Sequence, residues 1–168
     1  FAAGYDTSKN MLTMAMYAVM DKPEVYARCG EDAAYCRRVI NEVLRYHSVS
    51  SGTRFVIEDI VMRDVRLPVG TYLLIPWSVV GRDETAVANA DAFQPERQEG
   101  SPHVAFGLGP HICLGQFIAR APIEEGFHLI AQRLPNPKLA GKIGWRPFPG
   151  VWGIQGLPIT FEAAPALA

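Results

Sequence analysis

Apolar side chains recur at steps of three and four residues along the first part of the chain, which is the spacing of one face of an α-helix. The helix predicted over residues 1–20 is stopped by the Asp-Lys-Pro sequence that follows it, and its apolar face comprises Phe1, Met11, Leu12, Met14, Ala15, Ala18 and Val19. Two further helices are predicted over residues 23–29 and 31–46. The apolar face of the second comprises Val39, Ile40, Val43 and Leu44.

The period changes after residue 50, where β-branched and aromatic residues alternate with turn residues. Several short strands are predicted over residues 53–80, the last two joined around residues 68–70. A polar connection leads to a helix over residues 114–134, which Pro122 and Gly126 are expected to kink or break. The tail predicts two short strands around a Gly/Pro turn. The expected fold class is therefore α+β, mainly α, with helices flanking small sheets.

The composition fits one globular domain, because 49% of the 168 residues are hydrophobic and 20% are charged. The 16 Lys and Arg residues balance 17 Asp and Glu residues, and no basic run indicates a nucleic acid partner. Cys29, Cys36 and Cys113 are too few and too irregularly spaced for a disulfide framework or a metal finger. We therefore expect a reducing compartment, a cytoplasmic location and no binding to nucleic acid. No run of about eighteen apolar residues predicts a membrane span.

The segment FGLGPHICLGQFIAR, residues 106–120, places a cysteine where a helical pattern begins. Cysteine binds a metal as thiolate, which the free N–H groups and partial positive charge of a helix start stabilise. The neighbouring residue types suit a flat ligand: glycines let the backbone turn and approach closely, an aromatic ring can pack beside the ligand, and a histidine would share the cysteine's side of an extended loop. These residues are Phe106, Gly107, Gly109, His111, Cys113 and Gly115. The alternative is a buried structural cysteine behind a glycine-rich turn.

The pattern Phe-Gly-x-Gly-x-His-x-Cys-x-Gly has a chance frequency on the order of one in a million. It resembles the haem loop of the cytochrome P-450 family, the haem-thiolate monooxygenases. The resemblance implies that residues 1–168 are the C-terminal, haem-binding portion of a single cytochrome P-450 domain. It also implies haem b, iron protoporphyrin IX, as cofactor, with Cys113 as the axial metal ligand. A thiolate ligand pushes electron density onto iron and favours O–O bond cleavage.

The segments NEVLRY and FQPER extend the resemblance. Glu42 and Arg45 are spaced i, i+3, so they lie on one helix face and can form an ion pair. The resemblance adds Arg97, which follows Phe93 and Pro95, and implies a structural triad. For the pair alone, a solvated helix face is the alternative. Three buried charges stabilise only when all are paired, so loss of any one is expected to impair folding or haem retention.

The segment AAGYDTS resembles the oxygen-binding helix of the family. Ala3 and Gly4 would make room for a diatomic ligand, and a hydroxyl bonded to a backbone carbonyl can bend the helix there. The resemblance implies that Thr7 stabilises bound dioxygen and that Asp6 relays protons. The alternative is a helix start capped by Asp6 or Thr7.

The segment SVSSGTR resembles the family's substrate-pocket loop, which leads into an arginine that pairs with a haem propionate. This assigns Arg54, together with His111, to the carboxylates of the cofactor. An arginine that enters a strand is otherwise simply solvated. Substrate-pocket positions are expected at Val49, Ser50, Ser51, Val151 and Trp152.

The resemblance implies an oxidoreductase that inserts one oxygen atom from O2 into a small apolar organic substrate. Its two electrons would come from a ferredoxin- or flavodoxin-type donor docked on the proximal face near Arg120. Chains of this family are well over twice as long, so the remainder of the cytochrome P-450 chain is an expected partner, and this chain alone is not expected to be competent. The alternatives are a truncated haem-binding module without turnover, a fragment of a split enzyme, and a structural domain without haem.

Overall fold

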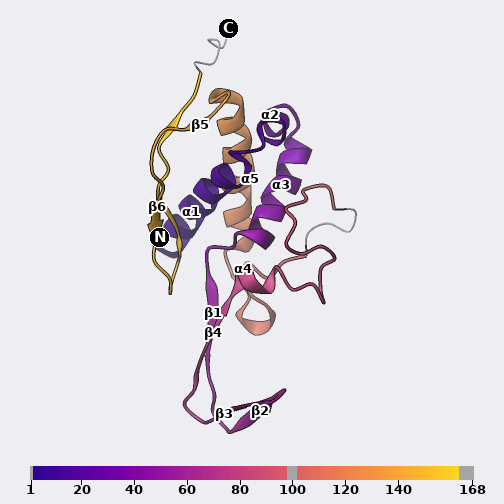
Figure 1. Ribbon diagram of the computed structural model, residues 1–168, viewed down its shortest axis with the longest axis vertical. Helices are drawn as coiled ribbons and strands as arrows, with labels where there is room; N and C mark the ends of the chain where they lie inside the picture. Colours follow the sequence, from indigo (N-terminus) through magenta and orange to yellow (C-terminus); the bar gives the residue numbers. More distant parts are fainter. Residues whose placement is uncertain (1, 98–101, 163–168) are drawn as a thin grey trace.

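The computed structural model describes residues 2–97 and 102–162 and consists mainly of helices (Figure 1). The helices are α1 (Ala2–Val19), α2 (Pro23–Glu31), α3 (Ala33–Tyr46), α4 (Trp77–Val80) and α5 (Gln116–Arg133), and a 3-10 turn spans Gly109–His111. The strands are β1 (Ser51–Phe55), β2 (Ile60–Met62), β3 (Val65–Leu67), β4 (Tyr72–Pro76), β5 (Lys138–Leu139), β6 (Gly144–Arg146), β7 (Gly153–Gly156) and β8 (Ile159–Thr160). The predicted α+β, mainly α class is confirmed. Phe1, assigned to the first helix, lies outside the described residues.

Helix α5 is at the centre of the core, where it contacts α1, α2 and α3. Figure 1 shows it between α1 on one side and α2 and α3 on the other. The apolar face predicted for α3 is buried, as are Ile123 and Phe127 of α5. Burying one such side chain contributes about 1.5–3 kcal/mol. The helical body is therefore held by the apolar faces that the sequence pattern predicts.

Helix α5 runs through Pro122 and Gly126 as one element, so the helix does not break at these residues, and the kink stays a prediction. Pro122 has no N–H to donate to the carbonyl one turn earlier. The helix continues because the turns after the proline are anchored in the core by Ile123 and Phe127. Gly126 faces α1, where an added Cβ would lie 3.7 Å from Cδ2 of Leu12.

Strands β1 and β4 form an antiparallel ribbon that projects from the helices and leads to the pair β2–β3 (Figure 1). The strands predicted over residues 53–80 are present, except that residues 77–80 form α4 instead of a strand. Residues 68–70 join β3 to β4 as expected, but these two strands belong to different sheets. Pairing with β4 fixes the position of β1, and with it the position of the segment that joins β1 to α3.

The tail forms two small antiparallel pairs, β6 with β7 and β5 with β8. Strands β6 and β7 flank the predicted Gly/Pro turn, and β5 and β8 are two strands beyond the two predicted. Strand β7 packs against α1, where an added Cβ at Gly153 would lie 3.3 Å from Oδ1 of Asn10. Glycine therefore permits the close approach of the β6–β7 hairpin to α1. Within residues 2–97 and 102–162, no helix combines the length and the apolar character that crossing a membrane requires.

Candidate functional site

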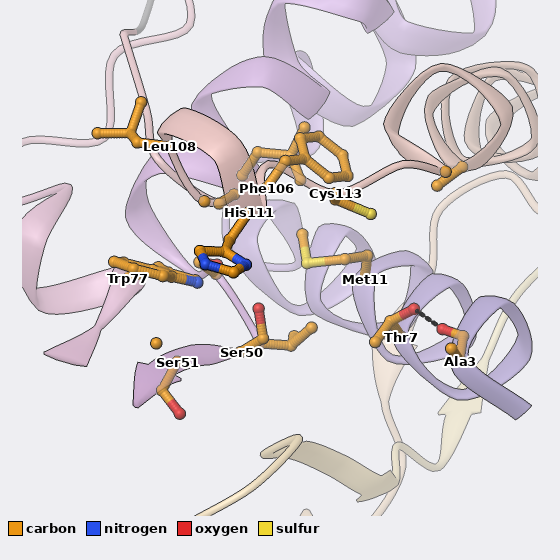
Figure 2. Close-up of a pocket in the computed structure, with 18 of the residues that line it drawn as sticks. Ala3, Thr7, Met11, Ser50, Ser51, Trp77, Phe106, Leu108, His111 and Cys113 are labelled. Atoms are coloured by element: carbon orange, nitrogen blue, oxygen red, sulfur yellow. Dashed lines mark hydrogen bonds between the residues drawn. The ribbon is translucent and has the colours of Figure 1, made fainter. Parts of the chain in front are cut away.

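A cavity of about 730 Å³ lies between α1, the segment that follows α3, and the loop before α5 (Figure 2). Most of the site residues predicted from the sequence line this cavity: Ala3, Gly4, Thr7, Val49, Ser50, Ser51, Arg54, Phe106, Gly107, His111, Cys113 and Gly115. They come from three segments that are far apart along the chain. The structure therefore brings the predicted oxygen helix, pocket loop and cysteine loop around one space.

The loop between Phe106 and Cys113, here called the cysteine loop, is closed by the backbone N–H of Cys113, which donates to the carbonyl of Phe106 over 2.7 Å. Gly107 (φ +76°) and Gly109 (φ +67°) adopt the left-handed conformation, which glycine takes without strain. A 3-10 turn replaces the extended form considered for this loop, yet His111 and Cys113 both line the cavity. Gly109 is absent from the lining, so its part is to shape the turn.

Helix α5 begins at Gln116, with Gly115 as its N-cap residue, so Cys113 precedes the helix instead of standing in its first turn. The Cys113 side chain is exposed on the wall of the cavity, whereas Cys29 and Cys36 are buried. A hydrogen bond with Cys36, together with burial, raises the pKa of Cys29 above its ordinary value. Among the described residues, Cys113 is therefore the cysteine that a ligand can reach.

Thr7 faces the cavity from α1, and its Oγ1 donates to the carbonyl of Ala3 over 2.7 Å (Figure 2). Such a bond competes with the helical hydrogen-bond ladder. Gly4 also lines the cavity, and an added Cβ there would meet nothing within 4 Å. Met11 completes this wall; it was not predicted, although its i, i+4 spacing from Thr7 places both residues on one helix face. A hydroxyl and open space thus adjoin on the same face of α1.

Asp6 lies outside the lining of the cavity, which differs from the position expected for a residue that relays protons into it. Its carboxylate accepts a hydrogen bond of 2.6 Å from Nη1 of Arg146 on β6 and pairs with Nζ of Lys9 at 3.3 Å. The hydrogen bond from Arg146 holds the pKa of Asp6 below its ordinary value. The reason for this placement is helical geometry, because successive residues of an α-helix point about 100° apart.

Arg54 and His111 both line the cavity, with exposed side chains. Nη1 of Arg54 donates to the carbonyl of Thr53 over 2.7 Å, and no carboxylate among the described residues pairs with its guanidinium. Since neither side chain pairs with an Asp or Glu in the described part of the chain, the two donors suit a negatively charged group in the cavity.

Residues 49–51 line the cavity, but Val151 and Trp152 lie outside its lining, so their contact with a substrate stays a prediction. The indole N–H of Trp152 donates to the carbonyl of Ser48 over 2.8 Å, and its backbone N–H donates to the carbonyl of Val49 over 3.0 Å. The tail turn is therefore bonded to the segment that lines the cavity without being part of the lining itself.

Glu42, Arg45 and Arg97 come together as a buried cluster. The carboxylate of Glu42 accepts hydrogen bonds from Nε and Nη2 of Arg45, at 2.9 and 2.7 Å, and from Nε of Arg97 at 3.3 Å. Nη1 of Arg45 donates to the carbonyls of Gly81 and Ala90, at 2.6 and 2.7 Å. The cluster thereby joins α3 to the connection that leads to the cysteine loop.

The sequence profile of the cytochrome P-450 family matches residues 1–134. The chain belongs to the cytochrome P-450 family. Luteothin monooxygenase of Streptomyces thioluteus is 37% identical over 164 residues, which are 96% of this chain and 40% of that relative. Mycinamicin VIII C21 methyl hydroxylase of Micromonospora griseorubida is 36% identical over 143 residues, which are 83% of this chain and 36% of that relative.

Solved cytochrome P-450 structures share the fold. The chain matches P450BioI, solved in complex with an acyl carrier protein ligated to hexadec-9Z-enoic acid, at a TM-score of 0.85 and 30% identity, over 95% of this chain and 42% of that one. It matches a cytochrome P-450 of Chondromyces apiculatus at a TM-score of 0.87 and 28% identity, over 96% of this chain and 42% of that one. The chain spans about 40% of the length of the curated relatives it matches.

Members of the cytochrome P-450 family carry a haem cofactor, and the lining residues fit such a group. The volume of about 730 Å³ lies within the range of about 300–1,000 Å³ typical of ligand pockets. At Gly4 and Gly115, both in the lining, an added Cβ would stand in open space. No group of three His, Cys, Asp or Glu side chains in residues 2–97 and 102–162 could hold a metal ion. A haem, by contrast, takes a single axial thiolate from the protein in this family.

Trp77 is a lining residue that nothing in its own segment marks as part of a cytochrome P-450 site. It opens α4, in the stretch for which a strand was predicted. Its place is made by Gly52 of β1, where an added Cβ would lie 2.5 Å from Cη2 of the Trp77 ring. Gly52 is the feature of the sequence that reflects this contact, but a glycine at this position can be interpreted only once the packing of Trp77 is known.

Proposed function

We propose that this chain is the haem-binding C-terminal portion of a haem-thiolate monooxygenase, in which Cys113 is the axial ligand of haem b. The observation that carries the proposal is the position of the exposed Cys113 on a cavity that Gly4 and Thr7 of α1 also line. In this proposal, residues 1–168 belong to a single domain that the remainder of a cytochrome P-450 chain completes. The coverage of about 40% of its relatives supports this division.

When bound, a haem with a thiolate ligand activates dioxygen with two electrons and delivers one oxygen atom to a substrate. The residues of this chain would hold and orient the reacting groups. Arg54 and His111 would bind the propionates, because they are donors that no Asp or Glu of the described residues pairs with. The Thr7 hydroxyl donates to Ala3, so its lone pairs are left to accept a hydrogen bond from a water or hydroxyl group in the cavity.

The substrate proposal rests on the lining and on the relatives. Apolar side chains such as Met11, Val49 and Leu108 face the cavity, which favours a small apolar organic substrate. The names of two relatives describe a monooxygenase and a methyl hydroxylase, in keeping with oxygen insertion. Contacts of residues 49–51 with this substrate, and a cytoplasmic location, stay predictions.

Cytochrome P-450 enzymes receive their electrons from redox partners, and we propose a ferredoxin- or flavodoxin-type donor on the proximal face. Arg120, expected as a landing point, is already engaged: Nε donates to Glu124 over 3.1 Å and Nη2 donates to Asn41 over 2.9 Å. These bonds orient the guanidinium, and the side chain of Arg120 stays 33% exposed to a docked partner.

Reconstitution with hemin tests the haem site. The reduced carbon monoxide difference spectrum of the wild-type chain should be of the thiolate type, and Cys113→Ser should abolish it. Cys36→Ala is the matched control, because Cys36 is buried away from the cavity and should leave the spectrum unchanged. A wild-type chain that binds hemin without a thiolate spectrum would contradict the assignment of Cys113.

A haem-binding module without turnover is the second candidate, and the coverage of about 40% of the relatives favours it for the chain in isolation. Adding a reductant, a redox partner and candidate substrates to the haem-loaded protein, with and without the preceding part of a cytochrome P-450 chain, separates the two. Product formed in the completed protein supports the monooxygenase. Haem binding without product in both supports the module.

A further inference from the structure

We propose that the indole N–H of Trp77 is a third hydrogen-bond donor to a haem propionate, beside Arg54 and His111. This inference rests on the proposed haem site and adds a cofactor-binding residue that neither the sequence motifs nor the relatives indicate. It would explain why an aromatic side chain with a polar edge stands on the wall of the cavity.

The Trp77 ring is held at a defined place on the ribbon. An added Cβ at Gly52 would lie 2.5 Å from Cη2 and 2.6 Å from Cζ2 of the ring, so the indole occupies the space that a side chain at this position would fill. The backbone N–H of Trp77 donates to the carbonyl of Ser50 over 3.2 Å, and its carbonyl accepts from the N–H of Gly81 over 2.8 Å. The ring is therefore fixed by both packing and backbone bonds.

The same strand carries Arg54. Gly52 and Arg54 are two positions apart on β1, paired with Ile75 and Leu73 of β4, and residues two apart in a strand share one face of the sheet. The indole that covers Gly52 thus stands on the face from which Arg54 projects. Figure 2 shows the nitrogen-bearing side of the Trp77 ring turned toward His111. All three side chains line the one cavity.

The indole donor is available for a ligand. Nε1 of Trp77 donates to no atom of the described residues, whereas Nε1 of Trp152 is satisfied by the carbonyl of Ser48 at 2.8 Å. An indole nitrogen can only donate, so its partner must be an acceptor. Among the described residues, no Asp or Glu lines the cavity, so a carboxylate acceptor would come from the ligand. A carboxylate accepts from all three groups, and hydrogen bonds to a charged acceptor are about twice as strong as neutral ones.

The substitution Trp77→Phe tests this assignment, because it keeps an aromatic ring and removes the N–H. Wild type and variant are loaded with haem or with haem dimethyl ester, whose propionates carry no charge, and dissociation is followed by transfer to apomyoglobin. We expect haem to leave Trp77→Phe about tenfold faster than wild type, as loss of one charge-assisted hydrogen bond implies. With the dimethyl ester the two proteins should differ by less than about twofold. Trp145→Phe is the matched control, since Trp145 does not line the cavity and should release both compounds like wild type.

Each outcome decides the matter. Equal haem release from Trp77→Phe and wild type, or equal acceleration with haem and its ester, overturns the role of the N–H while the thiolate spectrum of wild type leaves the proposed function standing. A wild-type chain that binds no haem overturns both. Urea unfolding of haem-free Trp77→Phe and wild type checks that the variant keeps its fold. Gly52→Ala, which displaces the ring, should reproduce the faster haem release.

Discussion

The carboxylate of Glu42 and the guanidinium of Arg45 form a two-point ion pair one helical turn apart, with both side chains 0% exposed. The backbone N–H of Gln94 donates to the same carboxylate over 2.8 Å, and Arg97 adds its Nε. Two charges without water are stable only while each keeps all its partners. The pair therefore makes the link between α3 and the connection before the cysteine loop dependent on every member of the cluster.

Glu42→Gln should lower the free energy of unfolding by about 3–5 kcal/mol, the usual cost of leaving a buried charge uncompensated. Urea titration followed by circular dichroism measures it. Arg66→Gln is the control, since it breaks the exposed pair of Arg66 with Asp59 and should cost less than about 1 kcal/mol. A Glu42→Gln protein as stable as Arg66→Gln would show that the cluster contributes nothing specific.

Gly81→Ala should be nearly as damaging for a steric reason. An added Cβ at Gly81 would lie 2.1 Å from the backbone carbonyl oxygen of Arg45, and backbone atoms cannot move aside as a side chain does. The φ of Gly81 is −65°, so alanine meets no conformational penalty there. We expect a loss of about 3 kcal/mol or more in unfolding free energy. Gly156→Ala, where an added Cβ meets nothing within 4 Å, should change it by less than about 1 kcal/mol.

The sequence predicted best what depends on local pattern. The apolar spacing that ends in Val39, Ile40, Val43 and Leu44 marked α3 because a helix buries residues of this period. The same reasoning allowed a break at Pro122 that does not occur, since a local rule for proline does not include the buried residues that follow it in α5. Tertiary packing decides such cases.

The site was predictable where one short segment carries it and not where two distant segments meet. The cysteine loop is readable because its glycines and Cys113 are consecutive in the chain. The hydrogen bond between Asp6 and Arg146 joins residues 140 positions apart, so no local sequence pattern predicts it. The contact of Trp77 with Gly52 also joins distant residues, as does the hydrogen bond from Trp152 to Ser48.

The stability of the chain should fall between about pH 6.5 and about pH 4 because of His47. Burial, with Arg82 and Lys22 nearby, lowers the pKa of His47 to about 4, whereas an unfolded histidine titrates near 6.5. Between these two pKa values His47 is neutral in the native state and protonated in the unfolded chain. Its contribution to the free energy of unfolding is therefore complete above the unfolded pKa and declines as pH falls. His103, lowered to about 4 by burial and Arg120, acts in the same direction.

His47→Gln should therefore flatten the fall in unfolding free energy over this pH range, measured by urea titrations at a series of pH values. Wild type, titrated in parallel, is the comparison. An unchanged slope in His47→Gln would mean that this ring does not stay neutral in the native state.

Arg146→Gln should raise the pKa of Asp6 toward its ordinary value, because the hydrogen bond from Arg146 is the main cause of its lowering. Lys9→Gln should raise it less, since Lys9 is the weaker partner, at 3.3 Å. A carbon-13 NMR titration of the Asp6 carboxyl in the haem-free chain measures both. Equal shifts in the two variants would show that Arg146 has no special hold on Asp6. If Asp6 relays protons in the completed enzyme, Arg146→Gln should also move the acid limb of the pH profile of product formation to higher pH. The reason is that a carboxylate with a higher pKa becomes protonated at a higher pH.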